Sequence, residues 1–98
     1  MQLARVIGQV VATVKEPGLD SFKILIVRNI DPSAPDDEAT ASPYVAVDLV
    51  GAGEGEIVTV AHGSAARVPR ATANTATDSA VVAIVDTLSI DGNVTFQK

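Results

Sequence analysis

The fold is decided by residues 4–14, which read ARVIGQVVATV. Every second residue from Ala4 to Val14 is apolar or glycine, whereas the residues between them are mixed. A period of two with one apolar face is typical of a long β-strand that packs on a core. Gly8 lies inside this pattern and predicts a bulge or a sharp bend, the feature that lets a strand curl around a barrel.

A second strand is predicted over residues 22–30, and both of its faces are apolar. One face carries Phe22, Ile24 and Ile26, and the other carries Leu25 and Val27. A strand that is apolar on both faces is expected to be covered on both, here by the core on one side and by a neighbouring chain on the other.

Further strand patterns follow along the chain. Residues 44–50 predict a strand with Val45, Val47 and Leu49 turned inward, residues 56–61 predict another, and residues 81–90 predict one long core strand. Turn signals separate them. Pro17-Gly18 predicts a tight turn, residues 31–43 predict an exposed acidic loop, and Asp91-Gly92-Asn93 predicts a hairpin with residues 94–96 returning.

These patterns predict one all-β domain over residues 1–98. We expect a small antiparallel β-barrel resembling the oligonucleotide-binding (OB) fold, because short strands follow one another at close spacing. One or two short helical turns are expected in addition, one of them over residues 63–67 with Ser64 as its N-cap.

Composition excludes several classes of protein. The chain has 7 Lys and Arg against 12 Asp and Glu, a net charge of −5, which argues against a nucleic-acid surface and against an anionic membrane face. It has no Cys and one His, which excludes a disulfide framework and a zinc site built on several histidines. No stretch has the length of a membrane span, so we expect a soluble cytosolic protein.

The apolar content is high for a small monomer. Hydrophobic residues make up 47% of the chain, while charged residues make up 19% and aromatic residues 3%. A chain of 98 residues cannot hide all of this apolar surface in its own core. Because large apolar patches rarely stay exposed, we expect part of the surface to be buried between subunits.

Two local patterns have partial similarity to functional motifs. The glycine-rich run over residues 51–55 has the wrong spacing for a nucleotide loop, so close backbone approach, in a turn or at a symmetry axis, explains it better. His62 and Ser64 are separated by one residue, and residues so close in sequence rarely form a catalytic nucleophile and its general base. We therefore predict no catalytic, cofactor-binding or metal-ligating residue.

Several segments, in this order, resemble the EutN/CcmL family of bacterial microcompartment vertex proteins. The matching segments are residues 1–13, 15–27, 45–56, 63–67 and 78–86, which together cover most of the chain. The resemblance implies an OB-like β-barrel that forms a homopentamer and caps the fivefold vertices of a shell. The other tiles of such a shell are hexameric and trimeric shell proteins, and the shell lies in the bacterial cytoplasm.

The resemblance implies no enzyme activity and no cofactor, and it directs attention to subunit contacts. We expect the glycine-rich loop to lie close to the fivefold axis. The candidate residues of the interface or of this axial loop are Phe22, Ile24, Ile26, Gly51, Ala52, Gly53, Glu54, Gly55, Ser64 and Arg67. The alternative hypothesis is a small oligomeric β-barrel that binds a metabolite or a peptide.

Overall fold

The computed structural model describes residues 1–13, 22–37, 41–68 and 77–98. The predicted turn at Pro17-Gly18 lies outside these ranges. In chain order the elements are β1 (Gln2–Val10), β2 (Lys23–Asn29), β3 (Tyr44–Asp48), β4 (Ile57–His62), the 3-10 helix η2 (Gly63–Arg67), β5 (Ser79–Ile84), β6 (Thr87–Ile90) and β7 (Asn93–Gln97). Within the described ranges, no helix is long and apolar enough to cross a bilayer.

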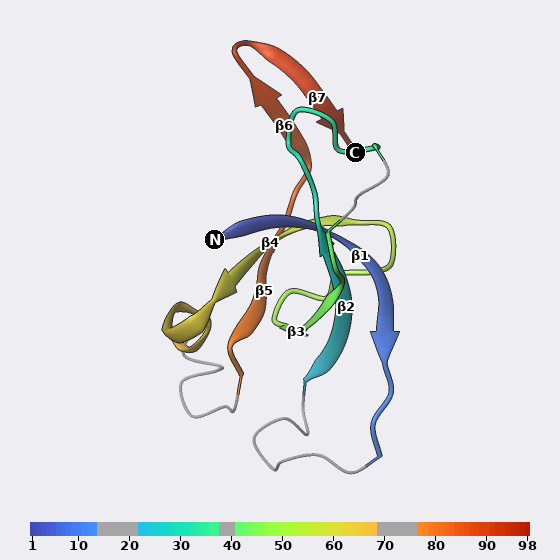
Figure 1. Ribbon diagram of the computed structural model, residues 1–98, viewed down its shortest axis with the longest axis vertical. Helices are drawn as coiled ribbons and strands as arrows, with labels where there is room; N and C mark the ends of the chain where they lie inside the picture. Colours follow the sequence, from blue (N-terminus) through green and yellow to red (C-terminus); the bar gives the residue numbers. More distant parts are fainter. Residues whose placement is uncertain (14–21, 38–40, 69–76) are drawn as a thin grey trace.

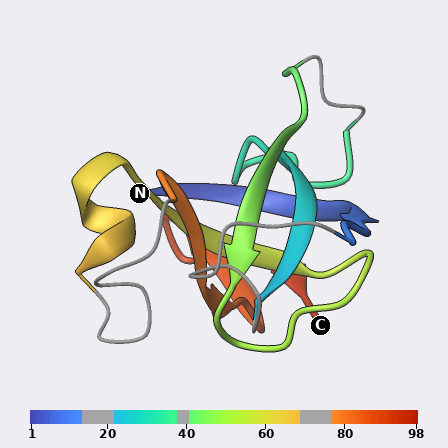
Figure 2. The same ribbon diagram turned by 90° about the horizontal axis from the view of Figure 1, so that it is seen from below.

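Five strands close into a barrel in the order β1-β2-β3-β5-β4, and β4 pairs back onto β1 (Figures 1 and 2). The pairs are antiparallel except for β3 and β5, which run parallel where Val47 and Asp48 face Ala80 and Val81. A five-stranded barrel of this kind is the architecture of the OB fold. The predicted all-β barrel is confirmed, with one parallel pair closing it.

β1 pairs with β2 on one side and with β4 on the other. Its register against β2 shifts between Val6 and Gly8, so Ile7 is an extra residue and is 39% exposed. A Cβ on Gly8 would lie 3.4 Å from the Ile26 side chain, within ordinary van der Waals contact, so the register shift itself is the evidence for the bulge. The bulge predicted at Gly8 is therefore confirmed.

The barrel interior is narrow and is filled by small and β-branched side chains. Its main cluster consists of Ala4, Val6, Leu25, Val27, Ala46, Ala52, Val58, Val60 and Val81, with Tyr44 and Ile84 packed against it. A second cluster lies outside the barrel wall and consists of Val47, Ala66 and Ala80, with Phe22, Leu49 and Val82 packed against it. Two small clusters of buried aliphatic side chains thus form the core of a chain in which only 3% of the residues are aromatic.

The inward residues predicted for β3 are wrong. Tyr44 and Ala46 face the barrel interior, while Val45 is 53% exposed and Val47 belongs to the second cluster. Both faces of this strand are apolar and partly covered, so the alternation of side chains does not reveal which face meets the core.

The long strand predicted over residues 81–90 is also wrong, because it is divided at Val85 and Asp86. The last ladder partners of β5 on β4 are Ile84 and Val58, and the Val85 N–H donates to the Ile57 carbonyl. Beyond this point β5 has no barrel partner, so the chain leaves the barrel as β6.

β6 pairs only with β7, and this hairpin stands away from the barrel (Figure 1). Its turn is the predicted one: Asp91 and Gly92 have φ angles of 51° and 80°. Two consecutive positive φ angles are the signature of a type I′ turn, which suits the twist of paired strands.

The acidic loop is anchored over residues 31–37. The Asp31 carboxylate accepts hydrogen bonds from the backbone and the hydroxyl of Ser33, and these bonds lower its pKa. The Thr95 hydroxyl of β7 donates to the Pro32 carbonyl. Pro35 is buried, so this part of the loop is packed against the barrel rather than fully exposed.

Candidate subunit-interface surface

The outward side of β2 and β3 carries a row of aliphatic side chains. Leu25 and Val27 face the core, which turns Ile24 and Ile26 outward. Their cross-strand neighbours on β3 are Val47 and Val45 respectively. Ile24 and Ile26 are half-buried in the isolated chain, so part of each side chain is still accessible and could be covered by a neighbouring subunit.

Phe22 occupies a different environment from the other two residues of its predicted face. It packs against the second cluster beside Val47 and Ala66 and is half-buried there. Part of its side chain is therefore covered by this chain itself.

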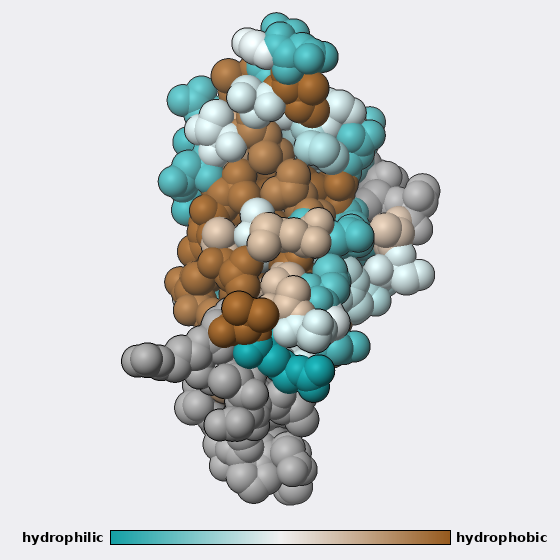
Figure 3. All heavy atoms as spheres, turned by 90° about the vertical axis from the view of Figure 1, so that its left-hand side faces the viewer, coloured by the Kyte–Doolittle hydropathy of each residue, from teal (hydrophilic) through white to brown (hydrophobic). Residues whose placement is uncertain are grey.

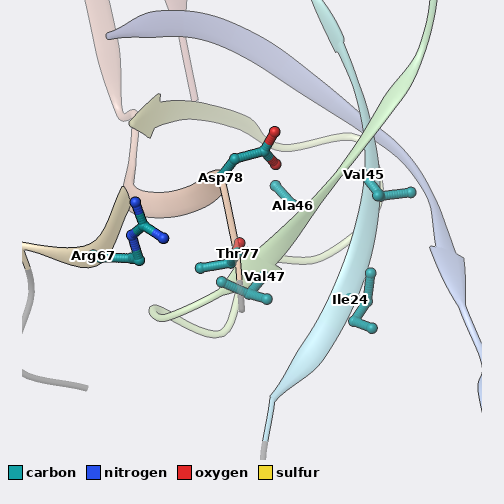
Figure 4. Close-up of a pocket in the computed structure, with 7 residues that line it drawn as sticks. All are labelled: Ile24, Val45, Ala46, Val47, Arg67, Thr77 and Asp78. Atoms are coloured by element: carbon teal, nitrogen blue, oxygen red, sulfur yellow. The ribbon is translucent and has the colours of Figure 1, made fainter. Parts of the chain in front are cut away.

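A hollow of about 400 Å³ opens beside this surface (Figure 4). Its lining residues are Ile24, Val45, Ala46, Val47, Arg67, Thr77 and Asp78. Figure 4 shows Arg67 on one side of the hollow and Ile24 and Val45 on the other. The site thus has aliphatic walls and a charged rim, which suits an apolar side chain entering from outside.

η2 supplies Arg67 to the rim of the hollow. Arg67 lies in the last turn of this helix and is exposed, while Ala66 points into the second cluster and holds the helix against the barrel. Ser64 is exposed inside the helix, so its predicted N-cap role is wrong. The N-cap residue is His62, which makes no side-chain cap hydrogen bond.

The glycine-rich loop is a braced turn. Gly51 and Gly55 have φ angles of 77° and 88°, a region that L side chains rarely adopt. The Asp48 carboxylate accepts hydrogen bonds from the Val50 and Gly51 N–H groups, and Lys23 Nζ donates to the Ala52 carbonyl at 2.8 Å. Turn geometry alone accounts for these two glycines.

Within this loop the predicted candidates differ in exposure. Ala52 is fully buried in the barrel core, so its side chain is not available to a neighbouring subunit. Glu54 is exposed and Gly53 is half-buried. The position of the loop relative to a symmetry axis stays a prediction.

Glu56 connects this loop to the end of the chain. Its Oε1 accepts from the Gly53 N–H at 2.8 Å and its Oε2 accepts from Lys98 Nζ at 2.6 Å. The Lys98 hydrogen bond, followed by the Gly53 N–H, lowers the pKa of Glu56, and the same contact raises the pKa of Lys98.

A polar network that the sequence did not predict lies at one end of the barrel. It takes one side chain from each barrel strand: Gln2, Asn29, Tyr44, His62 and Ser79. The Tyr44 hydroxyl donates to Asn29 Oδ1 at 2.6 Å, and Asn29 Nδ2 donates to Gln2 Oε1. His62 Nε2 lies 3.4 Å from the Tyr44 hydroxyl, and His62 Nδ1 lies 3.1 Å from Ser79 Oγ.

The direction of the network favours one histidine tautomer. With the Tyr44 proton donated to Asn29, the arrangement that satisfies both ring nitrogens has Nε2–H donating to Tyr44 and Nδ1 accepting from Ser79. His62 therefore pairs with a buried serine of β5, not with Ser64, and its far side meets a tyrosine rather than a carboxylate. This is a satisfied structural histidine. Within the described ranges, no three His, Asp or Glu side chains gather as a metal site.

A second apolar surface lies on another side of the barrel. Figure 3 shows apolar side chains running over the side that carries the N-terminus, β4, η2 and β5–β6. The pairing register places Leu3, Thr59 and Ala83 side by side on the outer face of β1, β4 and β5. Met1 and Val68 are 84% and 80% exposed. The chain therefore carries two different surfaces that lack a covering layer.

Comparisons with known proteins give a consistent result. Residues 1–86 match the family described as "Ethanolamine utilisation protein EutN/carboxysome". The shell vertex protein PduN of Salmonella typhimurium is 52% identical over 93 residues, which cover 91% of this chain and 99% of PduN.

Solved structures agree with this match. CcmL of Nostoc superposes with a TM-score of 0.89 at 37% identity, and the alignment covers 100% of both chains. GrpN of Rhodospirillum rubrum, a pentameric microcompartment shell protein, superposes with a TM-score of 0.75 at 44% identity, with 92% of this chain and 98% of GrpN covered.

Proposed function

The chain belongs to the EutN/CcmL family, and we infer from this premise that it is a structural shell vertex protein of a bacterial microcompartment. One observation carries the inference. The relatives named as shell vertex proteins align with the chain over nearly the whole length of both partners. The shell lies in the bacterial cytoplasm, and the protein is not an enzyme.

The working unit is a homopentamer, as in GrpN. A closed ring needs a heterologous contact, in which one surface of a subunit meets a different surface of the next. The two apolar surfaces of this barrel supply such a pair. We place the hollow lined by Ile24, Val45 and Arg67, together with the neighbouring Ile26, on one side of each contact. The surface with Met1, Leu3 and Ala83 lies on the other side.

Hexameric and trimeric shell proteins are the proposed neighbours of the pentamer. Tiles with sixfold symmetry form flat sheets, and a sheet closes into a polyhedron only through fivefold corners. Contacts along each edge of the pentamer need only be modest, because several weak contacts act together in one shell.

The alternative of a small binding barrel has less support. The hollow would have to receive a metabolite, yet it lies inside the surface that we assign to the subunit contact. The relatives that match the whole chain are named as shell vertex proteins, which supports the structural role.

Native mass spectrometry of the wild-type protein and of Val45→Glu tests the assignment. The wild type is expected at about 50 kDa, five times the 10.0 kDa of one chain. Val45→Glu should shift the mass toward 10.0 kDa with an unchanged circular dichroism spectrum, because a carboxylate buried in an apolar contact is costly.

Val11→Glu is the matched control, because Val11 is 83% exposed at the end of β1 and lies outside both surfaces. It should stay pentameric. A wild-type monomer at micromolar concentration would contradict the pentamer, and a pentameric Val45→Glu would contradict the interface.

A further inference from the structure

Two arginines face each other on the outer side of the barrel. Arg5 of β1 and Arg28 of β2 are direct partners in the antiparallel ladder. Like charges in this position repel one another unless each has a compensating partner. The partners of the two residues therefore decide what this part of the surface does.

Arg5 makes three side-chain hydrogen bonds through its terminal nitrogens. Its NH1 donates to the Gly55 carbonyl at 2.7 Å, and its NH2 donates to the Pro35 carbonyl at 3.3 Å and to Asp36 Oδ1 at 3.0 Å. These bonds pin the acidic loop to the glycine-rich loop. The side chain of Arg5 therefore has a structural role: its donors and its charge hold the two loops together.

Arg28 has no such partner among the residues that the structure describes. Its Nε is buried and lacks a hydrogen bond, and no carboxylate of the described ranges forms an ion pair with it. A buried donor without an acceptor is unfavourable. The fork of the guanidinium leaves its terminal nitrogens free for an acceptor from outside.

A hollow of about 210 Å³ lies directly at these arginines. Its lining residues are Arg5, Ile7, Arg28, Ile30, Pro35, Asp36 and Asp37. The aliphatic part of the lining, Ile7, Ile30 and Pro35, lowers the local polarity, which strengthens the attraction between a guanidinium and an anion. A planar guanidinium matches the two oxygens of a carboxylate or phosphate group.

We propose that this hollow is a binding site for a small oxyanion, of carboxylate or phosphate type, with Arg28 as its principal ligand. The carboxylate of Asp36 is paired with Arg5, and that of Asp37 is exposed on the same rim. These two negative charges weaken the site, so binding in the millimolar range is expected. The bound oxyanion accepts hydrogen bonds from the terminal nitrogens of Arg28, and its negative charge offsets the repulsion between Arg28 and Arg5.

Thermal unfolding with sodium phosphate and with sodium acetate tests the site, each against sodium chloride of equal ionic strength. About 20 mM of the bound anion should raise the Tm by about 2–5 °C. Arg28→Gln should abolish this rise, and Arg28→Lys should keep only part of it, because lysine has charge without the fork. Lys98→Gln removes the same charge elsewhere and should retain the rise.

A second readout is independent of stability. The chain has four arginines, so the Nε–H signals of arginine-labelled protein are few, and the Arg28 signal should move as the anion is added. A response to phosphate alone or to acetate alone identifies which oxyanion the site takes. No Arg28-dependent change with either anion, in both measurements, would overturn the proposal.

Discussion

The network at the barrel end makes Tyr44→Phe an informative perturbation. The substitution keeps the ring, so it creates no cavity, and it removes only the hydroxyl that joins Asn29 to His62. The lost 2.6 Å bond to Asn29 is worth about 1 kcal/mol net. Leaving Asn29 Oδ1 and His62 Nε2 without this partner in a half-buried place brings the expected loss to about 1.5 kcal/mol.

Equilibrium unfolding in urea measures this loss. Wild type and variant must be compared at one protein concentration, because the stability of an oligomer depends on concentration. Ser89→Ala, which removes an exposed hydroxyl on β6, is the control and should change stability by less than about 0.5 kcal/mol. If Tyr44→Phe is as mild as this control, the network does not hold the barrel end together and our reasoning is wrong.

Four further predictions concern the pH dependence of stability and the glycine-rich loop. Burial raises the pKa of Tyr44. The contribution of Tyr44 to the free energy of unfolding is therefore complete below about pH 10 and is lost as the pH rises through the folded-state pKa. Unfolding measured over an alkaline pH series should show this decline in the wild type and not in Tyr44→Phe. Lys98 and the Gly53 N–H lower the pKa of Glu56. The contribution of Glu56 to the free energy of unfolding is therefore present above about pH 4.3 and is lost as the pH falls through the folded-state pKa. In Glu56→Gln, the free energy of unfolding should fall less steeply as the pH is lowered through this range. Gly53→Val should fold, because a Cβ there meets nothing nearer than Glu56 Oε1 at 3.6 Å, and native mass spectrometry should show impaired ring assembly if the loop lies at the axis. Gly51 has a φ angle of 77°, which L side chains rarely adopt. Gly51→Ala should therefore lower the free energy of unfolding, measured in urea, by about 1 kcal/mol.

Local patterns in the sequence predicted the features that depend on one or two residues. The bulge at Gly8 and the turn at Asp91-Gly92 are examples, because a glycine inside a strand pattern and an Asp-Gly pair between two strands are signals that lie within a few residues. The outward side chains of Ile24 and Ile26 were also predicted, since alternation along β2 is regular.

Features that depend on distant residues were missed. The division of residues 81–90 follows from where β4 begins, at Ile57, because β5 runs antiparallel to it and has no barrel partner beyond that point. The parallel pairing of β3 with β5 follows from how the barrel closes. The network around His62 draws on all five barrel strands, so no window of sequence contains it. The N-cap at Ser64 was a local inference that failed, because η2 begins at Gly63 and its N-cap is His62, two residues before Ser64.

The central claim is that this protein closes the corners of a shell. Electron microscopy of shells assembled with and without it tests this claim most directly, with the enclosed enzymes assayed after release. The account predicts closed polyhedra in its presence, and open corners or elongated, unclosed shells in its absence, while the enzymes keep their activity. Complete, tightly closed shells in its absence, with no related protein present to substitute, would contradict it.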